Sequence, residues 1–228
     1  NRLGFGFDDL KYISNYIQKT IDVVLVMGHL SYSENKKSSL NTHQLNQFKK
    51  IKNSLARYKL SYSLANSNGV YLGNKYHYDV CRVGGILYGL SLHKDLPEKI
   101  KPVSSLRSKV LQVRFVAQGN SIGYGAKYIV KKNSKIATLG IGYADGLSRS
   151  YKGSAYYKGK KINFVGNISM DLSNVDVTNI KNIKENDWVE IFGENISISE
   201  MAINSNTISY EILSRLGNRI ERIYIYNN

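Results

Sequence analysis

The feature that most constrains the fold is a change of pattern near residue 100. Before it, segments with helical spacing of apolar residues alternate with short apolar runs that end in glycine or polar residues. After Pro97 and Pro102, short alternating segments follow one another, separated by glycines. The first pattern is typical of α/β folds and the second of antiparallel sheets. We therefore predict two domains, 1–103 and 104–228.

The first domain has the strand–helix order of an α/β barrel. Apolar spacing predicts helices over Asp8–Thr20 and Thr42–Lys59. The predicted strands are Ile21–Met27, as a buried parallel strand, Tyr62–Ala65 and Tyr78–Arg82. Sites in such barrels lie at the carboxyl ends of the strands. Three candidate side chains follow strands in this way, namely His29, Ser67 and Arg82.

The second domain is predicted to be mainly antiparallel, with a helix at Ser199–Asn204 and a further turn near Tyr210–Leu213. Its predicted strands are Ser108–Val116, Ser121–Val130, Ile136–Gly142, Lys161–Val165, Leu172–Val177, Trp188–Gly193 and Ile220–Tyr226.

Composition excludes several classes of protein. The single cysteine, Cys81, excludes a disulfide framework, and we assign no metal site. No apolar run is long enough to span a bilayer and no signal segment opens the chain, which predicts a cytoplasmic protein without a membrane partner. The net charge of +15 is spread evenly, +8 over residues 1–103 and +7 over 104–228. This even spread disfavours a nucleic-acid partner.

Six motifs in register indicate a family. They are Asn66–Gly69, Arg82–Gly89, Ser121–Tyr128, Ile141–Gly146, Val165–Asp171 and Thr207–Glu211. In this order and spacing the chain resembles alanine racemase, a pyridoxal-phosphate enzyme that interconverts L- and D-alanine. The opening Asn1–Phe5 is also similar to that family. The resemblance implies a barrel domain followed by a β domain and a head-to-tail homodimer with sites shared between subunits.

The resemblance also implies a cofactor site. Ser67, the backbone at Gly84 and Gly85, and Tyr210 match positions that hold the phosphate of pyridoxal 5'-phosphate, and hydroxyls and backbone N–H groups suit a dianion. Arg82 matches the arginine that faces the pyridine nitrogen. Because arginine stays protonated, it keeps that nitrogen unprotonated, which weakens the electron sink and disfavours transamination.

By the same resemblance, Tyr124 is the base on the L-alanine face, reaching into the partner subunit's site. His29 matches the residue that links this tyrosine to Arg82. Arg2 matches the arginine that lies near the base and the substrate carboxylate. Three residues match the substrate pocket, namely Tyr143, Met170 and Asp171. The first two restrict the pocket to a small side chain, whereas Asp171 is either pocket-lining or structural.

One element of the family pattern has no match. The family's second base is a lysine that also forms the Schiff base with the cofactor, and no lysine in 1–103 stands in such a context. Only about three strands precede the β domain, and the chain starts with Asn1. We therefore predict the C-terminal portion of a TIM-type α/β barrel followed by a mainly antiparallel β domain, inactive by itself.

Alternative functions remain open. The chain fits an alanine racemase that supplies D-alanine for peptidoglycan in a bacterium. It also fits another barrel-type pyridoxal-phosphate racemase, acting on serine, lysine or a broad range of amino acids. A third alternative is a non-catalytic remnant, or a basic β module that binds nucleic acid. The joint presence of the matched residues argues against decay.

Overall fold

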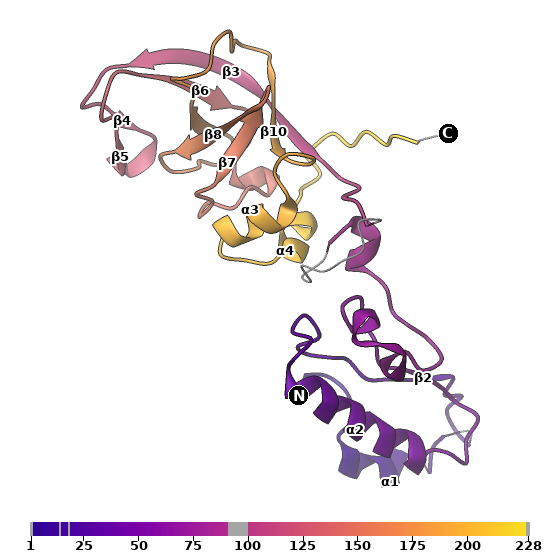
Figure 1. Ribbon diagram of the computed structural model, residues 1–228. Coiled ribbons are helices and arrows are strands. Elements are labelled where there is room, and N and C mark those ends of the chain that lie inside the picture. The colour runs from indigo at the N-terminus through magenta and orange to yellow at the C-terminus, as the bar shows by residue number, and fades with distance from the viewer. Residues whose placement is uncertain (1, 14, 18, 91–99, 227–228) are drawn as a thin grey trace. The chain divides into compact units, whose positions relative to one another are not determined.

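The computed structural model describes residues 2–13, 15–17, 19–90 and 100–226. The chain divides into two compact units, Asn1–Ile100 and Lys101–Asn228, which are described separately (Figure 1). Asn1, Pro97 and two residues of the predicted Asp8–Thr20 helix, 14 and 18, lie outside the described residues. Among the described residues, no helix combines the length and the apolarity that crossing a membrane requires.

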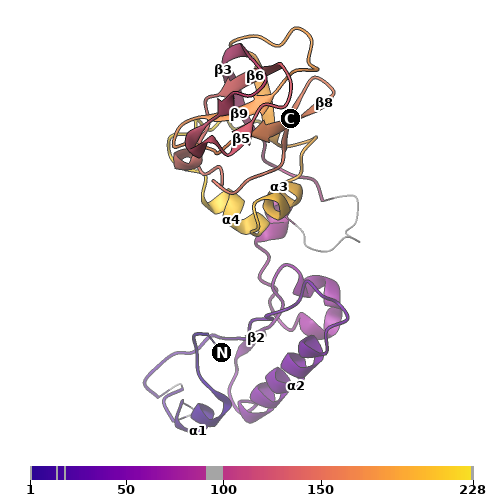
Figure 2. The same cartoon turned by 90° about the vertical axis from the view of Figure 1, so that its left-hand side faces the viewer.

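The first unit pairs a short parallel sheet with one long helix. Strand β1 (Leu25–Met27) pairs with β2 (Ser61–Ser63), and α2 (Ser39–Ser54) lies between them in the chain. The Ser38 hydroxyl caps α2 by accepting a hydrogen bond from Leu40 N at 3.3 Å. Figure 2 shows α2 beside β2. This arrangement is a strand–helix–strand unit of a partial α/β barrel.

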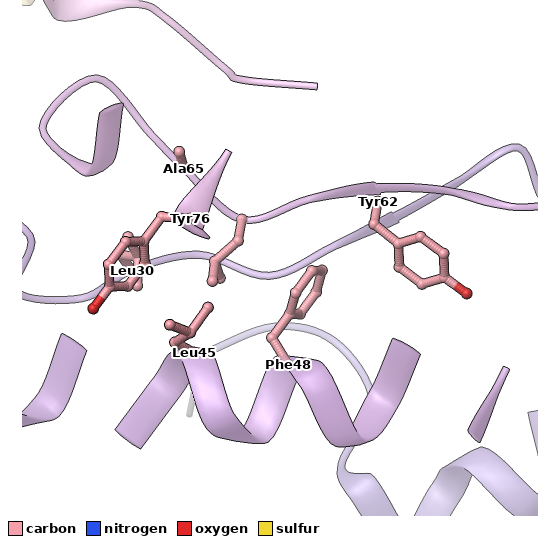
Figure 3. Packing of buried hydrophobic residues seen from close by; sticks show 7 residues of the cluster. Leu30, Leu45, Phe48, Tyr62, Ala65 and Tyr76 are labelled. Carbon is pink, nitrogen blue, oxygen red and sulfur yellow. The ribbon is translucent and has the colours of Figure 1, made fainter. Parts of the chain in front are cut away.

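The core of this unit holds the ends of both strands against α2. Leu45 and Phe48 of α2 are buried and belong to one apolar cluster with residues of β2 and of the loops that follow β1 and β2 (Figure 3). The Phe48 ring meets the Tyr78 ring edge-on at 4.9 Å between centroids. At Gly28, a Cβ would lie 2.9 Å from side-chain carbons of Leu64 and Phe48. Glycine therefore lets the end of β1 approach α2 closely, immediately before His29.

Three predictions for this unit were wrong. Among the described residues of the predicted helix Asp8–Thr20, the helical segments are the short 3-10 turn Phe7–Asp9, which begins one residue earlier, and α1 (Leu10–Ile13). Neither segment has a buried residue, and short helices without packing are marginal. The strand predicted over Ile21–Met27 covers three residues and is not buried, since Met27 is 61% exposed. Tyr78–Arg82 forms no strand, because only its end residues make isolated bridges, Tyr78 to Ser63 and Arg82 to Asn66.

The second unit is a closed antiparallel β-barrel. Its strand order is β10-β3-β6-β9-β8-β7. The strands are β3 (Leu106–Val116), β6 (Ser134–Leu139), β7 (Ser154–Tyr157), β8 (Lys160–Val165), β9 (Ser173–Asp176) and β10 (Trp188–Phe192). Inward side chains such as Val110, Leu139 and Val175 are fully buried. Two short helices follow, α3 (Ile198–Asn204) and α4 (Ser209–Ser214).

The strand predicted over Ser121–Val130 is a hairpin. β4 (Ser121–Ile122) pairs with β5 (Tyr128–Ile129), and a 3-10 turn, Tyr124–Ala126, joins them (Figure 1). Glycines at 123 and 125, with φ of 72° and 76°, make this turn possible. Ile122 packs with Val130, Ile136 and Val165, which fixes the hairpin to the barrel. The hairpin therefore presents Tyr124 at its tip.

The predicted C-terminal strand Ile220–Tyr226 was also wrong. This segment has no strand assignment, and Ile225 and Tyr226 are both 84% exposed. Its alternating pattern meets no open edge of the barrel, because β10 pairs with both β3 and β7 and closes the sheet. β7, in contrast, is a strand that the sequence pattern did not indicate.

Candidate active site

The side chain of Arg82 joins the ends of β1 and β2 in the first unit. Its Nη1 donates to Ser63 O at 3.1 Å and to Ser63 Oγ at 2.5 Å, and its Nη2 donates to Gly28 O at 2.6 Å. Its backbone N donates to Ala65 O at 3.0 Å. Burial lowers the pKa of the guanidinium, but arginine remains protonated at neutral pH. A fixed positive charge therefore lies at the carboxyl end of this sheet.

His29 lies between Arg82 and Asn66. Arg82 Nη2 is 3.4 Å from His29 Nδ1, and Asn66 Nδ2 is 3.3 Å from His29 Nε2. Asn66 is oriented by its other contacts, because its Oδ1 accepts from the Ser33 hydroxyl and from Gly69 N. Both ring nitrogens thus face donors, so a neutral imidazole accepts only one of the two bonds at a time.

This environment favours the neutral form of His29. Its pKa is lowered from 6.5, first by burial and then by the positive charges of Arg82 and Arg2. Arg2 itself is exposed and acts on His29 through its charge. The structure therefore brings three predicted site residues into one electrostatic group, which we call the Arg82 network: Arg82, His29 and Arg2.

Ser67 and Gly84 join two loops in the same unit. Ser67 is 5% exposed, and its Oγ accepts a hydrogen bond from Gly84 N at 2.9 Å, which leaves the hydroxyl hydrogen to donate elsewhere. A 3-10 helix, Gly85–Tyr88, begins directly after Gly84. Among the described residues, none accepts a hydrogen bond from the N–H of Gly85 or Ile86. No atom lies within 4 Å of a Cβ built on Gly84, so the backbone there is open to a ligand.

These features form a small set of donors, which we call the Ser67–Gly84 cradle. It consists of the buried Ser67 hydroxyl, whose hydrogen is left to donate, and the backbone N–H groups of Gly85 and Ile86, which follow the open backbone at Gly84. Such a set suits a phosphate dianion. The cradle therefore fits the phosphate group that the sequence predicted at these residues.

The second unit contains a cavity of about 480 Å³, called here the β-domain cavity. Four residues predicted from sequence lie in its wall, namely Tyr124, Tyr143, Met170 and Asp171. They come from three separate motifs, so the fold brings together positions up to 47 residues apart. Tyr210 is not in this wall; it lies on α4 and is 36% exposed.

Backbone contacts shape this wall. Tyr143 N donates to Ser169 O and Ala144 N to Met170 O, each at 3.0 Å, so the two wall segments run together. At Gly142, a Cβ would lie 2.2 Å from Met170 O, a distance no side chain tolerates. Glycine at 142 is therefore required for this approach.

An ion-pair group fixes the rim of the cavity. Arg219 Nη2 contacts Asp171 Oδ1 at 2.7 Å, and Arg219 Nε contacts Asp145 Oδ1 at 3.3 Å. The other oxygen of Asp145 accepts from Gly142 N at 2.8 Å. Asp171 thus both lines the cavity and is paired with Arg219, which combines the two alternatives left open from sequence.

Comparison with known proteins identifies the family. Residues 103–224 match the family described as alanine racemase, C-terminal domain, and residues 1–92 match alanine racemase, N-terminal domain. The chain belongs to the alanine racemase family. The two matched ranges correspond to the two units of the structure.

Individual relatives are similar over nearly the whole chain. The biosynthetic alanine racemase of Agrobacterium fabrum is 34% identical over 99% of this chain and 61% of its own length. The alanine racemase of Rickettsia bellii is 37% identical over 98% of this chain and 56% of its own length. The chain therefore spans about three fifths of the length of these relatives.

Solved structures agree with the fold. The alanine racemase of Bartonella henselae, a structure with covalently bound pyridoxal phosphate, has a TM-score of 0.93 and 36% identity. It matches 99% of this chain and 64% of that chain. The Bacillus anthracis alanine racemase, solved with bound L-Ala-P, has a TM-score of 0.90 and 28% identity. The predicted fold, a partial α/β barrel followed by a β domain, is confirmed.

The structure adds residues that sequence reasoning did not assign. Arg149 and Asn167 also line the β-domain cavity, and Arg219 pairs with Asp171. Asn167 lies inside the Val165–Asp171 motif and Arg149 three residues after Ile141–Gly146. The position of Arg149 and Asn167 in or near these motifs is the sequence signal that could have indicated both residues. No such signal marks Arg219, because its role depends on a contact with Asp171, 48 positions away in the chain.

The lowered pKa of His29 leads to a prediction on stability and pH. An unfolded histidine titrates near 6.5 and binds more protons than folded His29 as the pH falls below that value. The stability that neutral His29 contributes is therefore complete above about pH 6.5 and is lost as the pH falls through the folded pKa.

A proton NMR titration of the full-length protein, with His29→Gln to assign the resonance, measures this directly. We expect a midpoint below 6.5. A midpoint at or above 6.5 would show that burial and the charges of Arg82 and Arg2 do not keep His29 neutral.

Proposed function

We propose that the protein carrying this chain is an alanine racemase that uses pyridoxal 5'-phosphate to interconvert L- and D-alanine. The observation that carries the proposal is the match of 98–99% of the chain, through both units, to proteins named alanine racemase. Each unit supports it separately, because the Ser67–Gly84 cradle suits a phosphate and the β-domain cavity has Tyr124 in its wall.

Residues of this chain would hold the cofactor at its two ends. Ser67, Gly84, Gly85 and Tyr210 would bind the phosphate, and Arg82 would face the pyridine nitrogen. Arg82 suits this role because its contacts to Gly28 O and Ser63 orient the guanidinium. When bound, pyridoxal phosphate supplies an electron sink for negative charge at the α carbon of alanine.

The proton transfer on the L-alanine face would belong to Tyr124. Its phenolate oxygen would remove the α-proton from L-alanine, and the hydroxyl formed in this way would return the proton in the reverse direction. His29, kept neutral, and Arg2 would act beside this base, and Arg2 would also pair with the substrate carboxylate. Tyr143 and Met170 would narrow the cavity toward a small side chain, with Asp171 held by Arg219 at its rim.

The proposal extends to the assembly and to the cell. A head-to-tail homodimer would let Tyr124 of one subunit act in the site of the other. The host would be a bacterium that uses D-alanine in peptidoglycan, with the enzyme in its cytoplasm. The base for the D-alanine face is not among the residues that the motifs assign, so the experiments use the full-length protein.

A substrate panel tests the proposal against its alternatives. The full-length protein, loaded with pyridoxal phosphate, is given the L forms of alanine, serine and lysine, and chiral chromatography follows the D forms. We expect kcat/KM for alanine to exceed that for serine and lysine by tenfold or more, since one extra group in a fitted pocket costs about that much. Comparable values would support a broad racemase. No turnover, together with salt-dependent binding to DNA or RNA, would support the non-enzymatic alternative.

A further inference from the structure

Tyr124 lies in a turn with few hydrogen bonds of its own. The turn comprises residues 123–127 between the two-residue strands β4 and β5. Gly123, Gly125 and Ala126 all have positive φ, and Tyr124 is 72% exposed. A turn of this kind needs an outside contact to hold a side chain in one place.

Asn167 supplies such a contact. Its Nδ2 donates to the carbonyl oxygen of Tyr124 at 2.8 Å. Among the described residues, no other side chain donates a hydrogen bond to the backbone of this turn. Asn167 also lies in the wall of the β-domain cavity with Tyr124, so both act on the same space.

The backbones around these two residues are also packed together. A Cβ on Gly123 would lie 3.3 Å from Asn167 O, and a Cβ on Gly166 would lie 2.6 Å from Ile122 O. Glycine on each side lets the segment before Asn167 lie against the segment before Tyr124. The amide of Asn167 is therefore placed by the barrel, since Val165 ends β8 and belongs to the Ile122 cluster.

We infer that Asn167 is the positioning residue for the Tyr124 base. Its side-chain amide holds the Tyr124 carbonyl and so fixes the direction in which the tyrosine hydroxyl reaches the substrate. This inference rests on the proposed function for its kinetic consequence, but the contact itself does not. Asn167 is not a catalytic residue, because it acts through Tyr124.

The variant Asn167→Ala in the full-length protein tests this role. We expect kcat for L-alanine to fall about tenfold, because a small displacement of a base is costly in rate. The control is Asn163→Ala, which removes an exposed asparagine of β8 in the same barrel. The Asn163 side chain accepts a hydrogen bond from the Ser154 hydroxyl of β7 at 2.7 Å. We expect the control to retain the wild-type rate.

Isotope effects separate positioning from general damage. If Tyr124 is displaced, its proton transfer becomes slower than the transfer on the other face. The deuterium isotope effect on kcat/KM should then rise for 2-deuterated L-alanine and fall for 2-deuterated D-alanine. A rate loss with both isotope effects unchanged would overturn the inference, as would a wild-type rate in Asn167→Ala.

Hydrogen exchange keeps the test independent of activity. We expect the amides of the paired strands that the turn joins, Ser121–Ile122 and Tyr128–Ile129, to exchange faster in Asn167→Ala than in the wild type and in Asn163→Ala, because the hairpin then opens more often. Unchanged exchange would overturn the inference even if the wild type proved inactive. An inactive wild type with faster exchange in the variant would instead contradict the proposed function and leave the positioning role supported.

Discussion

Tyr124→Phe is expected to lower the racemisation of L-alanine by two to four orders of magnitude, the usual contribution of a general acid–base. The substitution removes one hydroxyl from a side chain that is 72% exposed, so the fold should be retained. Initial rates on the full-length protein, with thermal melting as a check of folding, measure the effect.

Tyr128→Phe is the matched control for this variant. Tyr128 lies in the same hairpin, on β5, but packs against the Ile122 cluster. We expect it to retain wild-type turnover. If Tyr124→Phe also kept wild-type turnover, the assignment of the L-face base to Tyr124 would be wrong.

Gly142→Ala is expected to destabilise the β domain and disrupt the β-domain cavity. The new Cβ would lie 2.2 Å from Met170 O and 2.5 Å from Asp171 N, so one of the two wall segments must move. Overpacking against backbone costs about 3 kcal/mol or more. The melting temperature should therefore fall by roughly 6 °C or more, and the KM for alanine should rise.

Gly140→Ala distinguishes this clash from the general effect of adding a methyl group. Gly140 lies two residues earlier in the chain, and a Cβ built there would lie 3.2 Å from the side chain of Leu111. The Leu111 side chain is exposed and can adopt another rotamer. We expect a change of less than about 1 kcal/mol there. Equal melting temperatures for both variants would show that the close approach at Gly142 does not hold the wall.

Local pattern predicted the barrel strands well and the edges of the fold poorly. β3, β6, β8, β9 and β10 follow alternating residues broken by glycine. Ile220–Tyr226 has the same alternation, but the closed barrel offers it no partner, and pairing is a property of the whole sheet. The hairpin at Ser121–Val130 was missed because Gly123 and Gly125 turn the chain within one apolar run.

For the candidate site too, the sequence indicated some features and not others. Sequence motifs and the family resemblance predict residues such as Ser67, Arg82 and Tyr124 as candidate members of the site, and their roles there stay predictions. The contacts that orient them were not visible in the sequence, because they join distant residues: Arg82 with Gly28 across 54 positions, and Asn167 with Tyr124 across 43. An asparagine in a loop has no pattern that predicts which carbonyl it will hold.

The most direct test is the approach to equilibrium from both sides. The full-length protein is incubated with L-alanine in one reaction and D-alanine in another, with and without pyridoxal phosphate, and chiral chromatography follows both enantiomers. The account predicts that the two reactions converge on equal amounts of L- and D-alanine, and only when the cofactor is present. Unchanged alanine in a folded protein that retains the cofactor would contradict it.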